Sequence, residues 1–214
     1  MEPVPGLREQ KKQRTREHLA ATALRLFLER GFDEVSVVDV AAAAQVSKPT
    51  LFRYFPSKED LLLDRFADHQ GEAARVVRAR PAGQTPVQAL HEHFLDRLRE
   101  HDPATGLSDH PDVVAFQRLL YGTASLQSRL LHYLAGDVEL LAEELATVFA
   151  DPLGARLAAL HLLAVRNELG RRNFERIAAG CSAAEAYPAA VADAGLAYGM
   201  LAEGIGGVGI APGA

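Results

Sequence analysis

Apolar residues recur every three or four positions along most of this chain, the spacing that places them on one face of an α-helix. Between residues 36 and 62 polar and turn-forming residues divide this pattern into three short segments. The first segment has small apolar side chains at helical spacing, namely Val37, Val40, Ala41 and Ala44. Because small side chains allow a second helix to cross closely, we expect this segment to be one member of a helix pair.

Two of the three segments begin with the spacing of a capping box. Ser36 is followed three residues later by Asp39, and Ser57 by Asp60. In such a box the serine oxygen accepts a backbone N–H of the first turn, and the acidic side chain reaches back to the serine N–H. The pattern therefore predicts that one helix begins at Ser36 and another just after Ser57.

The middle segment, residues 48–54, is predicted to be a second short helix. Ser47 can cap it, Pro49 is tolerated in the first turn, and Pro56 stops it. Two short helices joined by a tight turn form a helix-turn-helix, whose second helix can enter the major groove of DNA. The side chains expected to turn inward are Leu51, Phe52 and Phe55.

The outer side of this second helix carries groups that can bind phosphates and base edges. Positive charge, hydroxyl and phenol groups are supplied by Lys48, Thr50, Arg53 and Tyr54. An ordinary αα-hairpin with a solvated basic face has the same periodicity, so spacing alone leaves both interpretations open.

The identities of these residues carry information that their spacing alone does not. A helix ending in F-x-x-x-G-F is followed by S-V-x-x-V-A-x-x-A-x-V-S-x-x-T-L-F-x-Y-F-x-S-K-E-x-L, and residues 15–62 resemble the N-terminal domain of the TetR family of transcriptional regulators. Gln45 stands where that family usually has Gly, and Phe52 replaces the commoner Tyr. The matching residues are Phe27, Gly31, Phe32, Ser36, Val37, Val40, Ala41, Ala44, Val46, Ser47, Thr50, Leu51, Phe52, Tyr54, Phe55, Ser57, Lys58, Glu59 and Leu61.

The resemblance implies an all-α protein with an N-terminal three-helix helix-turn-helix domain, residues 1–60, and a helical C-terminal ligand-binding and dimerisation domain, residues 61–214. It implies a repressor that a small effector releases from a double-stranded DNA operator. The residues expected to contact DNA are Lys48, Pro49, Thr50, Arg53, Tyr54, Lys58, Ser36, Ser47, Arg14 and Arg16.

The composition is compatible with this interpretation once the net charge is counted separately for the two predicted domains. The chain has 214 residues, 48% of them hydrophobic, and a net charge of −5. Residues 1–60 carry 10 Lys and Arg against 9 Asp and Glu, so the acidic excess lies beyond residue 60. Local basic surface, rather than total charge, governs DNA binding.

The single Cys181 excludes an intramolecular disulfide and fits a reducing, cytoplasmic compartment. The sequence contains no apolar run of membrane-spanning length.

The N-terminal segment is predicted to be a basic arm before the first helix. Residues 1–7 contain two prolines and a glycine and are expected to be disordered. Thr15 is the expected cap of the first helix, and Gly31 its end. The cations that could neutralise phosphates there are Arg8, Lys11, Lys12, Arg14 and Arg16.

Beyond residue 60 the pattern predicts helices throughout. The helix that begins at Lys58 should continue through Phe66 to about Arg78 and link the two domains. Further helices are expected over residues 86–101, 113–121, 126–149, 153–179 and 182–204, with a loop at 103–111 and an unstructured tail after residue 204.

The last two helices are the expected dimerisation elements. The resemblance implies that they pair with their twins in a four-helix bundle. DNA geometry favours pairing independently, because a two-fold dimer places two recognition helices about 34 Å apart. The alternative is that both faces pack within one subunit. The positions on the expected faces are Leu157, Leu160, His161, Ala164, Glu168, Ala186, Ala190, Val191, Ala194, Leu196, Ala197 and Met200.

The resemblance also implies a pocket for an effector, which the Ala- and Leu-rich composition predicts to be hydrophobic. The candidate lining residues are Phe94, Arg97, Phe116, Leu120, Tyr121, His132 and Asn167. Core packing or surface exposure is the competing interpretation for each. No cofactor, metal site or catalytic motif is expected, so an enzyme is disfavoured. Two rivals remain: a DNA-binding dimer without a ligand, controlled by abundance or a protein partner, and a helical enzyme or binding module that merely retains the hairpin.

Overall fold

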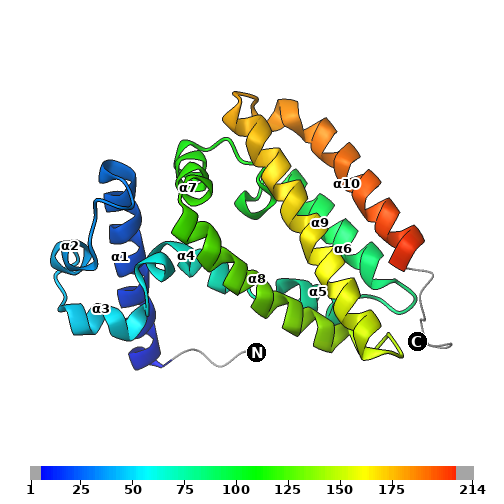
Figure 1. The fold of residues 1–214 in the computed structure, drawn as a ribbon, viewed down its shortest axis with the longest axis horizontal. Coiled ribbons are helices and arrows are strands. Elements are labelled where there is room, and N and C mark those ends of the chain that lie inside the picture. The colour runs from blue at the N-terminus through cyan, green and yellow to red at the C-terminus, as the bar shows by residue number, and fades with distance from the viewer. Residues whose placement is uncertain (1–5, 206–214) are drawn as a thin grey trace. The chain divides into compact units, whose positions relative to one another are not determined.

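A computed structural model describes residues 6–205, and within that range the chain forms ten α-helices, one short 3-10 helix and no strand (Figure 1). This confirms the all-α expectation. The chain divides into two compact units. The first unit contains residues up to 68 together with 118–130, and the second contains 69–117 together with the residues from 131 onward. The tail was expected to begin after residue 204, but Ile205 still belongs to the last helix; the rest of the tail and residues 1–5 lie outside the described part.

The first unit is built on four helices. They are α1 (Leu7–Arg30), α2 (Val37–Ala43), α3 (Lys48–Tyr54) and α4 (Lys58–Asp68). Helix α1 packs against α2 and α4, and α2 packs against α3. Phe27 and Phe32 close the core beside the end of α1, with ring centroids 4.9 Å apart. Gly31 ends α1 with φ +92°, as its position in the sequence predicted.

The three predicted serine caps are confirmed. The Ser36 side chain accepts from the Asp39 N–H, and the Asp39 carboxylate accepts from the Ser36 N–H. Ser57 and Asp60 make the same reciprocal pair at the start of α4. Ser47 accepts from the N–H of Thr50 and caps α3. The three helix starts are therefore fixed by hydrogen bonds within four residues of sequence.

The start of α1 differs from the prediction. The helix begins at Leu7 with Gly6 as N-cap, so Leu7 is helical where disorder was expected. Thr15 is not a cap, because it lies in the third turn of the helix and its Oγ1 donates to the carbonyl of Lys11 at 2.9 Å. Because the Thr15 hydroxyl finds its hydrogen-bond acceptor on the preceding turn, the helix continues through this residue.

The predicted long helix from Lys58 to Arg78 is also wrong. It is interrupted by residues 69–71, and a separate helix, α5 (Glu72–Ala79), follows. Gly71 has φ +72°, a left-handed conformation that an α-helix cannot contain. A Cβ at this position would lie 3.2 Å from Cδ1 of Leu140, so a side chain is disfavoured sterically as well.

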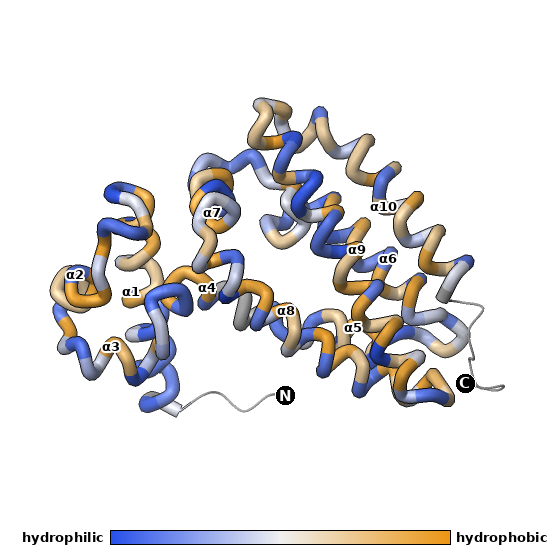
Figure 2. The backbone as a smooth tube through the Cα atoms, in the orientation of Figure 1, coloured by the Kyte–Doolittle hydropathy of each residue, from blue (hydrophilic) through white to orange (hydrophobic). Residues whose placement is uncertain are grey.

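The second unit surrounds a continuous apolar core. Figure 2 shows how hydrophobic and hydrophilic positions alternate along its helices. Helix α6 packs against α5 and α10, and α10 also packs against α9. Fully buried core residues include Val77, Leu98 and Leu141. The other elements are α6 (Pro86–Arg99), the 3-10 helix η1 (Pro103–Thr105), α7 (Pro111–Gly122), α8 (Ala124–Leu145), α9 (Pro152–Ala178) and α10 (Ala183–Ile205), and the predicted helices match them to within a few residues except at the end of α8.

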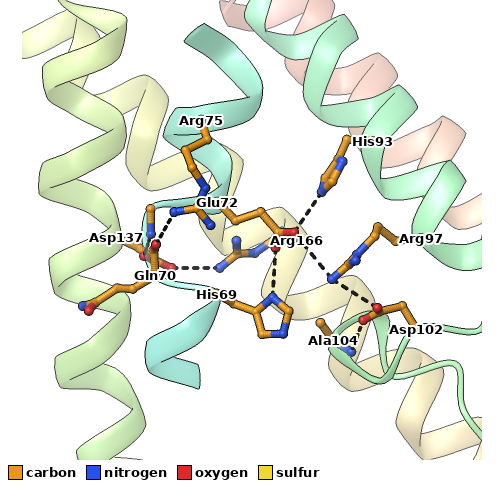
Figure 3. Close-up of polar contacts among 11 residues, drawn as sticks. His69, Gln70, Glu72, Arg75, His93, Arg97, Asp102, Ala104, Asp137 and Arg166 are labelled. Carbon is orange, nitrogen blue, oxygen red and sulfur yellow. Dashed lines mark hydrogen bonds and ion pairs between the residues drawn. The ribbon is translucent and has the colours of Figure 1, made fainter. Parts of the chain in front are cut away.

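A polar cluster centred on Glu72 joins the beginning of α5 to α6 (Figure 3). One carboxylate oxygen of Glu72 lies 3.4 Å from Nε2 of His93 and 3.5 Å from Nη2 of Arg97, and the other lies 3.5 Å from Nδ1 of His69. Arg97 Nη2 also lies 3.1 Å from Asp102. The hydrogen bond from His93, aided by the charge of Arg97, lowers the pKa of Glu72 to about 2, against the opposing effect of burial.

Helix α8 makes a polar contact in each unit. In the first unit, Arg129 donates from Nε and Nη2 to the two carboxylate oxygens of Asp60, at 2.8 and 3.1 Å. In the second unit, Asp137 accepts from the Gly71 N–H at 2.9 Å and from Arg166 of α9 at 3.3 Å (Figure 3).

We expect Arg129→Met to lower the free energy of unfolding by about 1–2 kcal/mol, because the Asp60 carboxylate is 4% exposed and loses its bidentate partner. Asp60→Asn keeps an oxygen for the cap but removes the charge. A double-mutant cycle by urea unfolding should give a coupling of about 1 kcal/mol or more. Arg156→Met is the control, because its pair with Glu139 is exposed. Strictly additive losses would show that the two side chains do not stabilise each other.

Stability should also depend on pH through Glu72. Because its pKa is lowered from 4.5 to about 2, its contribution is complete above pH 4.5 and is lost as the pH falls toward 2. Glu72→Gln should therefore destabilise the chain by about 1–2 kcal/mol at pH 7, and this difference should shrink progressively below pH 4.5. Unfolding curves across this range, with the exposed Glu139→Gln as control, measure the effect. If the loss of stability in Glu72→Gln does not depend on pH, Glu72 contributes by packing alone.

Candidate nucleic-acid interface

Helix α3 presents one side to solvent and buries the other. With 3.6 residues per turn, positions 48, 49, 52 and 53 project from the same side, and all four residues there are exposed. Leu51 and Phe55 are fully buried and anchor the opposite side. Thr50 and Tyr54 lie at the boundary and are half-buried. The predicted contact residues Lys48, Pro49 and Arg53 thus share one surface, with Thr50 and Tyr54 at its edge.

Phe52 lies on the exposed side, where inward packing was predicted. Its side chain is 39% exposed, whereas Leu51 and Phe55 fill the space beneath the helix completely. The inward prediction for Phe52 is therefore wrong, because positions 51 and 55 share the buried side and position 52 faces away from it.

Two cations of this surface lie over aromatic rings of the same helix. The Lys48 ammonium is 5.8 Å from the ring centroid of Phe52, and the Arg53 guanidinium is 5.5 Å from that of Tyr54. Such contacts hold flexible side chains close to the helix while leaving their N–H groups available to acceptors. The hydroxyls of Ser47 and Thr50 are 2.8 Å apart and bond each other. The charged groups of α3 are therefore better placed than its hydroxyls to meet phosphates or bases.

Two of the expected contact residues are engaged within the unit. Arg16 donates from Nε to Asp64 at 2.7 Å, and its Nη1 lies 3.5 Å from the Tyr54 carbonyl that ends α3. Its guanidinium also lies 4.9 Å from the ring centroid of Phe55. Lys58 stands over Phe32, 4.2 Å from the ring centroid. These two cations hold α3 and the start of α4 against α1.

The remaining expected contacts are exposed and lie on α1 and α2. Arg14 projects from α1, as do other basic residues of its first turns, Arg8, Lys11 and Lys12. Ser36 is exposed at the start of α2. Its hydrogen bonds, first from the side chain and then from the backbone, lower the pKa of Asp39. The cap thus keeps a carboxylate ionised at the N-terminus of α2, where the helix dipole favours it.

Sequence reasoning missed the residues that fix α3 from outside its own segment. Asp60 was identified as a cap, but not as the acceptor of Arg129 in α8. Asp64, the acceptor of Arg16, was not singled out. The partners are 69 and 48 residues apart in sequence, so no local pattern connects them.

The seven residues predicted to line an effector pocket are spread across the chain. Leu120 and Tyr121 belong to the first unit, and the other five to the second. Phe94 is buried at 4% exposure, 6.1 Å from the ring centroid of Tyr198, and Arg97 belongs to the Glu72 cluster. His132 is exposed, and Phe116 and Asn167 are half-buried.

An apolar pocket lies elsewhere in the second unit, between α9 and α10, with a volume of about 520 Å³. None of those seven residues lines it. His161 is its one residue with a titratable side chain, and the other walls are apolar or glycine. The lining is formed by Phe149, Gly154, Leu157, Ala158, His161, Val165, Ala197, Met200, Leu201 and Gly204.

The two helices that border this pocket also carry exposed apolar side chains. Helices α9 and α10 run side by side and antiparallel (Figure 1). On α10, Ala186, Ala190 and Ala194 pack into the core of the same chain. The large side chains that remain exposed are Leu153, Leu157 and Leu160 on α9 and Leu196 and Met200 on α10, at 41–67% exposure.

A candidate metal cluster and a membrane-spanning helix are both absent from the described residues, 6–205. This part of the chain has no group of three or more His, Cys, Asp or Glu side chains placed to hold a metal ion. None of its helices combines the length and the apolar character needed to cross a membrane.

Comparison with known proteins identifies the first unit. Residues 19–64 match the family described as bacterial regulatory proteins, tetR family. The chain is 38% identical over 99 residues to the HTH-type transcriptional regulator TcmR of Streptomyces glaucescens, a match that covers 45% of this chain and 44% of TcmR. It is 51% identical over 94 residues to EthR of Mycolicibacterium smegmatis, covering 41% and 42%.

The likeness of fold extends over most of the chain. NalD, the secondary repressor of the MexAB-OprM multidrug efflux pump in Pseudomonas aeruginosa, superposes with a TM-score of 0.56 at 16% identity and covers 87% of this chain and 97% of its own. The chain spans less than half the length of the two curated relatives above. The helix-turn-helix geometry, the family match and the shared fold together show that the chain belongs to the tetR family of regulatory proteins.

Proposed function

We propose that this protein is a dimeric DNA-binding transcriptional repressor, not an enzyme, which a small hydrophobic effector releases from its operator. The observation that carries the proposal is the exposed side of α3, where Lys48 and Arg53 flank Pro49 and Phe52 on a helix anchored by two fully buried residues. A rigid, cationic helix of this length matches the recognition helix of a helix-turn-helix. Such a repressor would act in the cytoplasm.

Phosphate and base contacts fall to different residues. Arg53 is exposed and can bond guanine bidentately, whereas Lys48 is a point charge suited to a phosphate. Arg14 and its exposed basic neighbours on α1 add charge that contributes to binding at low salt. Arg16 and Lys58 support this surface chiefly by positioning α3, since both are engaged within the unit.

Dimerisation is proposed to occur through α9 and α10. Five large apolar side chains are exposed on the described part of these two consecutive helices, while other residues of the same helices, such as Ala158, Leu162 and Ala190, pack into the core. Burying such a surface against its twin removes apolar area from water. It also supplies the two-fold symmetry that two half-sites on DNA require.

The effector is proposed to bind in the apolar pocket between α9 and α10. About 520 Å³ is enough for a small organic molecule, and the apolar lining favours a hydrophobic one. Leu157 and Met200 belong both to this lining and to the proposed dimer surface. An effector bound there would therefore change how the two subunits meet. A coupling of about 1–3 kcal/mol would alter operator affinity roughly 5- to 150-fold.

Arg53→Ala should test the recognition role. Loss of a base contact should weaken operator binding about 5- to 150-fold while binding to random duplex changes less. The operator can be recovered by selecting bound sequences from random duplexes, and affinities measured by fluorescence anisotropy at fixed salt. Arg25→Ala is the control, because this exposed α1 arginine already pairs with Glu29. If Arg53→Ala lowers the affinity for operator and for random DNA equally, Arg53 does not contribute to base recognition.

Leu196→Glu should disrupt the dimer, because a carboxylate would be buried without a partner at the proposed interface. We expect monomers by analytical ultracentrifugation at micromolar concentration and loss of cooperative operator binding. Leu131→Glu on α8 is a matched control, since Leu131 and Leu196 are both 67% exposed and both belong to the second unit. If the Leu196→Glu protein remains dimeric, the dimer interface does not lie on this side of α10.

A further inference from the structure

The exposed side of α3 has an apolar strip at its centre. Pro49 and Phe52 project between Lys48 and Arg53, so the cations border the strip on either side. Within the described part of the first unit, only Leu28 of α1 and Val38 of α2 are also large apolar side chains exposed to this degree. The recognition surface is therefore not uniformly polar.

Packing does not require an aromatic ring at position 52. Leu51 and Phe55 fill the core beneath α3, and Phe52 remains 39% exposed. The Lys48 ammonium, one turn earlier, lies 5.8 Å from the ring centroid, so the cation and the ring share the exposed side of α3. The ring is thus presented outward in a defined position.

The chemistry of the ring limits what it can recognise. Phenylalanine has no hydroxyl, so Phe52 can neither donate to a phosphate nor bond a base edge. In the major groove, thymine alone among the four bases offers a methyl group, and apolar side chains contact it. Burying that methyl against the ring would also remove part of the exposed aromatic surface from water.

We infer that Phe52 is a specificity-determining residue that selects thymine at one position of each operator half-site through contact with its 5-methyl group. This inference rests on the proposed DNA-binding function and assigns a base to one side chain of that surface. Lys48 and Arg53 then bind polar groups on either side of the selected thymine.

The test removes the methyl from the DNA and the ring from the protein separately. In the operator recovered by selection, each thymine is replaced in turn by deoxyuridine, which pairs identically but lacks the methyl. Wild-type affinity should fall about fourfold at one thymine per half-site, and roughly 10- to 20-fold when both symmetry-related positions are replaced. Phe52→Ala should bind thymine and deoxyuridine operators equally.

Two further variants separate recognition from folding. Phe52→Leu keeps an apolar side chain and should retain part of the preference for thymine. Leu28→Ala truncates an apolar residue of matched exposure, 38%, on α1 and should retain the whole preference. Thermal melting and affinity for random duplex report whether each variant is folded.

The outcomes are distinct. Specific operator binding by the wild type that tolerates every deoxyuridine would overturn the inference and leave the proposed function intact. The same holds if wild type and Phe52→Ala lose equal affinity at the same thymine, because another side chain would then contact the methyl. Failure of the folded wild type to select any duplex sequence would overturn the proposed function itself, and the inference with it.

Discussion

The carboxylate of Asp60 fixes the turn on which the recognition surface depends. Its Oδ2 accepts from the N–H and the hydroxyl of Ser57, and both of its oxygens accept from Arg129. At 3% exposure, an ionised carboxylate is stable only because these donors replace water. The turn that follows α3 is therefore determined both by its own residues and by a helix 69 residues away.

A second ion pair, between Arg16 and Asp64, also holds α3 in place. Arg16 bonds Asp64 on α4 and approaches the carbonyl at the end of α3, while its guanidinium covers the ring of Phe55. Helix α3 has only seven residues, too few to be stable alone in water. Two buried anchors, a serine cap and these ion pairs around α4 hold it in place and leave its proposed DNA-binding side exposed.

Local chemistry explains what could be predicted from the sequence. The capping serines, the end of α1 at Gly31 and the bounds of α3 each depend on residues within one turn, and all were predicted correctly. The break at Gly71 was missed because helical periodicity continues across it, and the left-handed glycine is stabilised by Asp137, 66 residues later. The exposure of Phe52 was missed because hydrophobic character was taken to mean burial, although position 52 faces away from the core.

The fold also has a consequence for the order in which the chain is synthesised. Residues 118–130 complete the first compact unit, so that unit is discontinuous in sequence. When residues 1–68 leave the ribosome, Arg129 has not yet been made, and the Asp60 carboxylate lacks that guanidinium until all of α7 and the start of α8 have been translated. Helix α3 thus reaches its final support late, after more than half of the chain has been translated.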